Sequence, residues 1–160
     1  MFFIDVQGGT QTMRHLAQDA VVYLMNKEMP RKRVLRLDIE IKNLRKDGCF
    51  GMIDSWKDYG KDYSLIELDN GKHTSLYDFI ETVCHEFVHL RQFLTGDYRQ
   101  KGNKIYWKGH DFTDISYYNQ PWEKEAFALQ HSLAKYIIKE KLGVTLNKAR
   151  QTKVRAYKNG

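Results

Sequence analysis

The chain has 160 residues, of which 42% are hydrophobic and 29% are charged, and its formal net charge is +6. This balance is typical of one globular domain and excludes an extended disordered chain. No apolar run approaches the roughly 20 residues that cross a bilayer, and the first residues do not resemble a signal peptide, so we expect a cytoplasmic protein.

The first half of the chain predicts one helix followed by three strands. Apolar residues recur at helical spacing from residue 10 to about 27, and Pro30 marks the stop. Apolar and charged residues then alternate over residues 34–41, as in a half-buried strand. Residues 49–54 and 63–69 predict two further strands.

The second half predicts two helices separated by an irregular segment. An apolar stripe runs along residues 75–94 and predicts a long helix. Residues 97–118 are polar and aromatic, with Gly102-Asn103 as the turn of a hairpin. A last helix begins at 119–121, where proline suits the first helical position, and ends at Gly143.

This order predicts an α+β domain over residues 1–143, with a small three-stranded sheet that could be mixed. Residues 144–160 form a basic tail. The tail has no acidic residue and carries Lys148, Arg150, Lys153, Arg155 and Lys158. We expect a solvated, frayed terminus, and contact with nucleic acid is the alternative.

The chemistry is concentrated in His-Glu-Phe-Val-His at residues 85–89. His85 and His89 are four residues apart on the long predicted helix, so both imidazoles can reach one zinc ion. Glu86 lies about 100° around the helix axis, where its carboxylate can act as general base on a zinc-activated water. The pattern predicts a zinc-dependent hydrolase.

A catalytic zinc needs a third protein ligand and one open position. Glu123 and Glu125 lie in the first turn of the last helix, and His110 lies in the irregular segment. At this point Glu123, Glu125 and His110 are all candidates for the third ligand. His15, His73 and His131 have no companion at metal-ligand spacing and are interpreted as structural or surface residues.

The His-Glu-x-x-His motif followed by Glu-x-x-Ala on a later helix resembles the gluzincin metallopeptidases. The resemblance implies that Glu123 is the third zinc ligand. The predicted order of elements is similar to minimal zincin and SprT-like domains, which many phages and bacteria encode, so action in a host cell is compatible with it. Where many gluzincins have an acidic residue or asparagine four positions after the ligand glutamate, this chain has Phe127, so that partner is either missing or comes from elsewhere.

Two further roles are predicted around the metal. A second donor besides zinc should stabilise the carbonyl oxygen, and Tyr117, Tyr118 and His110 are candidates. The strand over residues 63–69 precedes the active helix, and zincins bind extended substrate along an open edge. We therefore expect Ser64–Leu68 to pair with peptide backbone.

The leading hypothesis is a peptidase that acts on proteins or peptides with one catalytic zinc. One alternative is a DNA-associated, SprT-like protease tethered by the basic tail. Another is a zinc-stabilised binding or regulatory module without turnover. Cys49 and Cys84 form no Cys-x-x-Cys pair, so we expect two free thiols and no cysteine-ligated zinc.

Overall fold

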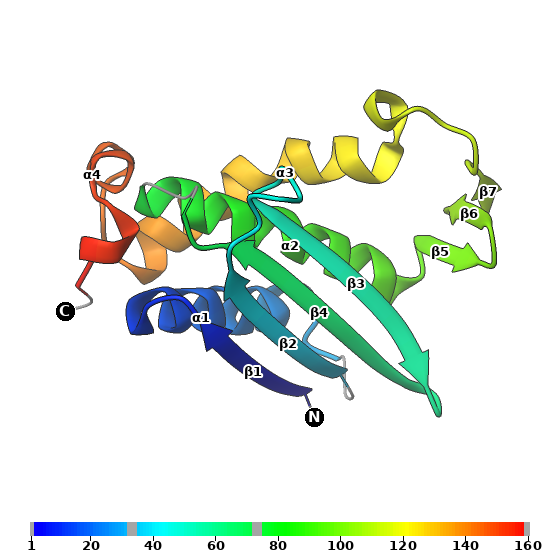
Figure 1. Ribbon diagram of the computed structural model, residues 1–160, viewed down its shortest axis with the longest axis horizontal. Coiled ribbons are helices and arrows are strands. Elements are labelled where there is room, and N and C mark those ends of the chain that lie inside the picture. The colour runs from blue at the N-terminus through cyan, green and yellow to red at the C-terminus, as the bar shows by residue number, and fades with distance from the viewer. Residues whose placement is uncertain (1, 32–34, 72–74, 159–160) are drawn as a thin grey trace.

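A computed structural model describes residues 2–31, 35–71 and 75–158. The fold is α+β, as predicted. A four-stranded sheet packs one face against two long helices, α1 (Gln11–Glu28) and α2 (Leu76–Thr95), and Figure 1 shows the sheet in front of them. The core lies between these two layers. Among the described residues, no helix has the length and apolar character that a membrane span requires.

The sheet has one strand more than the sequence predicted. Its order is β1 (Phe2–Gly8), β2 (Leu35–Lys42), β4 (Lys61–Asp69) and β3 (Gly51–Asp58). Strands β1, β2 and β4 are parallel and β3 is antiparallel to β4, so the sheet is mixed. β1 escaped prediction because it is a half-exposed outer strand with no fully buried residue. Val34, the start of the first predicted strand, lies outside the described residues.

The position of β4 corrects one prediction. β4 was expected to be the open edge, but it pairs with β2 on one side and with β3 on the other. Its backbone therefore has no free edge for a peptide, and Ser64–Leu68 cannot pair with substrate. The outer strand nearest α2 is β3.

The helices begin and end where the sequence chemistry predicts. The side chain of Thr10 caps α1 by accepting from the Met13 N–H, and Ser75 caps α2 in the same way through Asp78. α2 ends at Gly96, whose φ of 80° suits the left-handed cap. α3 (Pro121–Tyr136) starts at the predicted proline and continues as one π-helical segment, η2 (Ile137–Lys141).

The segment between α2 and α3 is more ordered than predicted. The expected hairpin is present as β5 (Tyr98–Lys101) and β6 (Lys104–Trp107), and β7 (His110–Asp111) adds a short third strand. A single 3-10 turn, η1 (Tyr117–Asn119), leads into α3. The hairpin is anchored where Tyr98 and Trp107 contact Trp122, with ring centroids 5.2 and 6.3 Å from it.

The prediction of a frayed basic tail is wrong for the described part of that segment. The chain forms α4 (Leu146–Gln151) and η3 (Val154–Ala156), and Ala149 and Val154 are fully buried in the main core. The Leu76 N–H at the start of α2 donates to the Thr152 carbonyl over 2.8 Å. The many charged residues made this segment resemble a solvated tail, but its few apolar residues pack into the core of the domain.

Candidate metal centre

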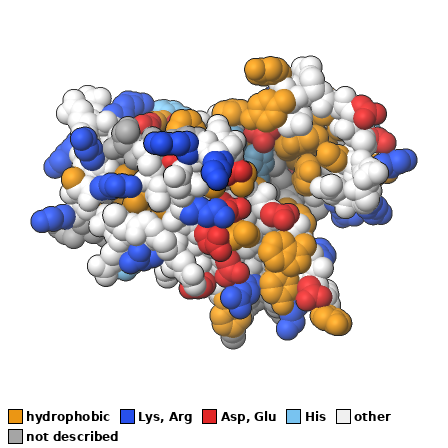
Figure 2. Space-filling model, viewed as in Figure 1, with side chains coloured by type: hydrophobic (Ala, Val, Ile, Leu, Met, Phe, Trp, Pro, Cys, Tyr) orange, Lys and Arg blue, Asp and Glu red, His pale blue; other side chains and the backbone are white. Residues whose placement is uncertain are grey.

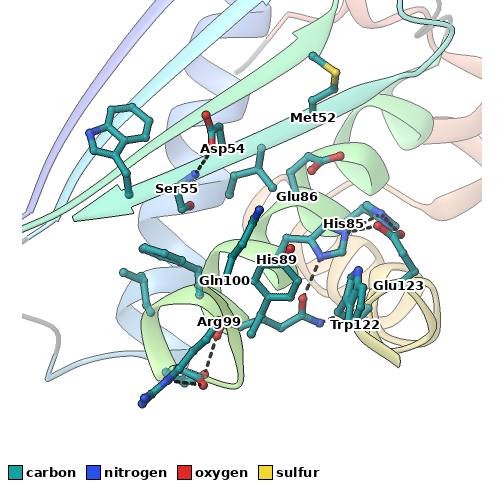
Figure 3. Close-up of a pocket in the computed structure, with 18 of the residues that line it drawn as sticks. Met52, Asp54, Ser55, His85, Glu86, His89, Arg99, Gln100, Trp122 and Glu123 are labelled. Atoms are coloured by element: carbon teal, nitrogen blue, oxygen red, sulfur yellow. Dashed lines mark hydrogen bonds and ion pairs between the residues drawn. The ribbon is translucent and has the colours of Figure 1, made fainter. Parts of the chain in front are cut away.

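Two helices bring the predicted ligands together. His85 and His89 lie on one face of α2, and Glu123 lies in the first turn of α3. The two Nε2 atoms are 3.2 Å apart. Glu123 Oε1 lies 3.1 Å from His89 Nε2, and its Oε2 lies 3.3 Å from His85 Nε2. Figure 3 shows the three side chains converging on one point.

The donor set fits a zinc ion. Zinc bonds of 2.0–2.1 Å in a tetrahedron place their donor atoms about 3.3 Å apart. The two Nε2 atoms here are 3.2 Å apart, and one donor atom from each of the three side chains lies within 4.8 Å of the others. Two imidazoles and one carboxylate supply three ligands and leave a fourth position for water or substrate. Among the described residues, this is the group of metal-ligand side chains that could hold an ion.

The three groups also shift one another's charge. Burial opposes ionisation of Glu123, but hydrogen bonds with His85 and His89 outweigh it and hold the Glu123 pKa at about 2. Burial likewise opposes protonation of His89, yet the Glu123 carboxylate raises the His89 pKa above its ordinary value. The cluster thus holds a carboxylate ready to neutralise a cation.

Each ligand histidine is oriented by a glutamine. His85 Nδ1 lies 2.7 Å from Gln130 Oε1, and His89 Nδ1 lies 2.9 Å from Gln92 Oε1. An amide oxygen can only accept, so each Nδ1 donates to its glutamine and Nε2 is the nitrogen that faces Glu123 and is left to bind a metal. Phe127 does not supply this partner; its ring packs against His85 at 4.8 Å between centroids.

Glu86 is held beside the cluster by β3. Its side chain is only 4% exposed, and burial raises its carboxyl pKa, although the nearby His89 and His85 oppose the rise. Gly51 lies against it: a Cβ on Gly51 would stand 2.8 Å from Glu86 Oε1. Close approach of the strand therefore fixes this carboxylate next to the metal position, as Figure 3 shows.

The two alternative ligands have other positions. Glu125 Oε1 accepts from Arg91 over 3.1 Å and from Gln92 Nε2 over 3.3 Å, so it supports the ligand helix from outside the cluster. His110 is exposed on β7 and is not part of the cluster. Of the three candidates, Glu123 alone joins the two histidines.

The candidate donors to a carbonyl oxygen differ in placement. Tyr117 lines the groove that contains the cluster, and burial together with the charges of Glu123 and Glu86 raises its pKa. Tyr118 is 87% exposed, and it does not line that groove. Tyr117 is therefore the better placed hydroxyl.

Two other described histidines, His15 and His131, are not part of the cluster. His15 is exposed, and His131 Nδ1 bonds the Tyr77 hydroxyl. His73 lies outside the described residues. Cys49 lines the groove that contains the cluster. The Cys84 thiol is buried, and burial raises its pKa, which fits a core residue better than a nucleophile.

A groove of about 1240 Å³ leads to the cluster. One wall is the outer strand β3, and the other is strand β5 with Gly102 and the end of α2. His85, Glu86 and His89 line one part of it, and Trp122 lies beside Glu123 at its border. The groove therefore follows β3 from Gly51 to Lys57 and reaches the metal position.

Sequence reasoning missed Gln92, Gln130 and Gly51. Gln92 follows His89 by three residues and Gln130 follows Glu123 by seven, so each lies on the same helix face as a ligand. This helical spacing could have predicted both glutamines. Nothing in the sequence pointed to Gly51, because its role depends on how β3 meets α2.

Comparisons of the chain with models of protein families, with curated proteins and with solved structures found no match.

Proposed function

We propose that this protein is a zinc-dependent peptidase of gluzincin type, with His85, His89 and Glu123 as ligands and Glu86 as general base. The observation that carries the proposal is a buried carboxylate beside a three-ligand cluster that opens into a long groove. Such a combination is typical of metal-assisted hydrolysis. A protein or peptide is the substrate that fits a groove walled by an outer strand.

A zinc ion at this site would lower the pKa of a water molecule and polarise a carbonyl oxygen. Glu86 would take a proton from the attacking water and pass it to the leaving amine nitrogen. The Tyr117 hydroxyl donates to the carbonyl oxygen as charge develops there. Gln130 and Gln92 keep the ligand imidazoles oriented throughout.

β3 supplies the position for the substrate backbone. In its ladder with β4 the N–H groups alternate between β4 and the outer edge. The outward groups of β3 face the groove side and can pair with an extended peptide. This assigns to β3 the role that the sequence had suggested for β4.

The decisive experiment is Glu86→Gln. We expect hydrolysis of an unfolded casein-like substrate to fall by about 10²–10⁴-fold, because the general base is lost. Zinc content, measured by mass spectrometry, and the melting temperature should stay unchanged. Glu81→Gln removes a carboxylate five residues earlier on α2, where Glu81 accepts from the Tyr77 hydroxyl, and should retain activity.

The same pair of variants tests the non-catalytic alternative. A zinc-stabilised binding module predicts no hydrolysis in the wild-type protein and no functional change in Glu86→Gln. Zinc-dependent cleavage that survives Glu86→Gln would contradict the assigned base. Wild-type protein that is loaded with zinc and cleaves neither casein nor a peptide library would contradict the peptidase.

A further inference from the structure

The four-stranded sheet has one face that no described helix covers, and Figure 1 looks onto it. Strand register places its outward side chains in three cross-strand rows. The first row is aromatic and contains Phe3, Arg36, Tyr63 and Trp56. The second row contains Asp5, Asp38, Leu65 and Asp54. The third row contains Gln7, Glu40, Glu67 and Met52. We call these rows the open sheet face.

The open sheet face is acidic, although the chain is basic. Its three rows hold five carboxylates and one guanidinium, and Lys42 at the end of β2 contacts two of these carboxylates, Glu40 and Glu67. Acids still outnumber bases here, whereas the whole chain has a net charge of +6. Figure 2 shows acidic side chains gathered near the middle of this view, with hydrophobic side chains beside them and most basic ones further out. The segregation of charge favours a cationic partner on this face.

Several carboxylates lie directly opposite one another on neighbouring strands, which lowers the stability of the sheet. Asp5 lies directly opposite Asp38, and Glu40 lies directly opposite Glu67. Like charges in such positions repel and destabilise a sheet. Lys42 contacts Glu67 and relieves one pair. The Asp5–Asp38 pair has Arg36 at 3.4 Å from Asp38 as an exposed counter-charge, which is worth little.

The aromatic row adds a surface that suits cations. The Phe3 side chain is 61% exposed and the Trp56 side chain is 43% exposed. Trp56 stacks on Tyr63 with centroids 6.1 Å apart. Exposed ring faces next to carboxylates attract lysine and arginine, whose charged ends bind the acids while their stems lie on the rings.

The open sheet face is continuous with the candidate active-site groove. Met52, Asp54 and Trp56 belong to its rows and also line the groove, because all three lie on β3. A chain that enters the groove along β3 can therefore continue across the edge onto the sheet. This continuity identifies the occupant as part of the molecule that is cleaved.

We propose that the open sheet face docks a lysine- and arginine-rich segment of the protein substrate, next to the segment that lies in the groove. The inference rests on the proposed peptidase function and names its substrate class: proteins with a basic stretch beside the cleavage site. Docking on the sheet is non-covalent. Docking raises the local concentration of the cleavable segment at the metal centre.

Binding is tested with a labelled oligolysine about 20 residues long and zinc-loaded Glu86→Gln protein at about 0.15 M salt. Fluorescence anisotropy should show saturable binding to oligolysine and none to oligoglutamate of equal length. Asp5→Lys with Asp38→Lys should raise the Kd by at least about tenfold. The matched control is Asp19→Lys with Glu140→Lys, which changes net charge equally on exposed helical positions, and its Kd should stay within about twofold.

Three results would overturn docking on this face. One is an equal loss of binding in the matched control, which would mean that only net charge matters. Another is the absence of oligolysine binding. The third is self-association of the wild-type chain in sedimentation that Asp5→Lys with Asp38→Lys abolishes, because the face would then bind a second copy.

Two readouts separate docking from structure and from catalysis. Asp5→Asn should weaken oligolysine binding while leaving the melting temperature equal or higher, because it removes like-charge repulsion; a lower melting temperature would assign Asp5 a structural role instead. With a cleaved peptide, an oligolysine extension should lower KM in wild type and not in the Asp5→Lys, Asp38→Lys variant, with kcat unchanged. Face-dependent oligolysine binding without any hydrolysis would contradict the peptidase and leave the docking surface.

Discussion

At the scale of the residue, Gly51 decides how closely the sheet approaches Glu86. A methyl group at Gly51 would stand 2.8 Å from Glu86 Oε1 and must displace the carboxylate. We expect Gly51→Ala to lower kcat by about tenfold to a hundredfold, because small misplacements of a catalytic group are costly. Kinetics and zinc content should be measured together, and zinc should be retained.

The control for this substitution is Gly71→Ala. A Cβ there would meet its nearest neighbour, Asp69 Oδ2, at 3.8 Å, which is ordinary contact. Equal activity in Gly51→Ala and Gly71→Ala would contradict the positioning role of Gly51.

Gln130 tests the orientation of the ligands. Gln130→Ala removes the oxygen that accepts from His85 Nδ1, so the imidazole can rotate or change tautomer. We expect zinc affinity to fall by about tenfold to a hundredfold, as measured by competition with a coloured chelator. Gln18→Ala on the exposed side of α1 is the matched control, and an equal zinc affinity in both variants would contradict the assignment.

The sequence predicted those site residues whose spacing along one helix follows a known metal-binding pattern. His85, Glu86 and His89 form a pattern on one helix, and Glu123 was favoured by resemblance. The glutamines were missed because an amide has no spacing rule of its own. His110 remained an alternative because nothing in the sequence tells which of two distant segments folds back onto α2.

At the scale of the element, β3 carries the prediction about substrate binding. The Asp69 N–H donates to the Phe50 carbonyl, so alternation points the Ile53 N–H away from β4. Ile53→Pro removes that outward donor and should raise KM by about threefold to tenfold, the value of one hydrogen bond. Ile53→Ala loses the same side chain but keeps the N–H.

The comparison is made between these two variants with a peptide substrate. Zinc content should match in both, because an outer strand tolerates proline where its N–H faces away from the ladder. If Ile53→Pro and Ile53→Ala have the same KM, the β3 edge does not pair with substrate.

Helices were predictable at this scale and sheet order was not. Caps and stop signals such as Thr10, Ser75 and Gly96 are local, so they can be read along the chain. The order β1-β2-β4-β3 depends on contacts between distant segments, and it moved the outer strand from β4 to β3. The tail was misjudged because burial of Ala149 and Val154 depends on a surface formed by other elements.

At the scale of the whole molecule, the metal should join the two helices that form the centre. Ligands from α2 and α3 assemble only in the folded chain, so zinc binding adds to the free energy of unfolding. At zinc about 100-fold above its Kd the gain is about 2.7 kcal/mol, or about 5–10 °C in melting temperature for a chain of this size. Scanning calorimetry of chelated and reloaded protein measures it.

His85→Ala is the control for that measurement. Its melting temperature should respond little to zinc, because one of three ligands is gone. A wild-type melting temperature that does not change on reloading would contradict a zinc site at this cluster.

The segment from β5 to η1 is one continuous excursion between the two ligand-bearing helices. Its base is closed where the Lys108 N–H donates to the Asp97 carbonyl over 2.7 Å and where Tyr98 and Trp107 meet Trp122. The ligands lie on helices that meet independently of the hairpin tip. Under the proposed function, this wall of the groove is therefore a replaceable module: a change in its length or composition would change the preference among substrates while the two helices that hold the cluster stay as they are.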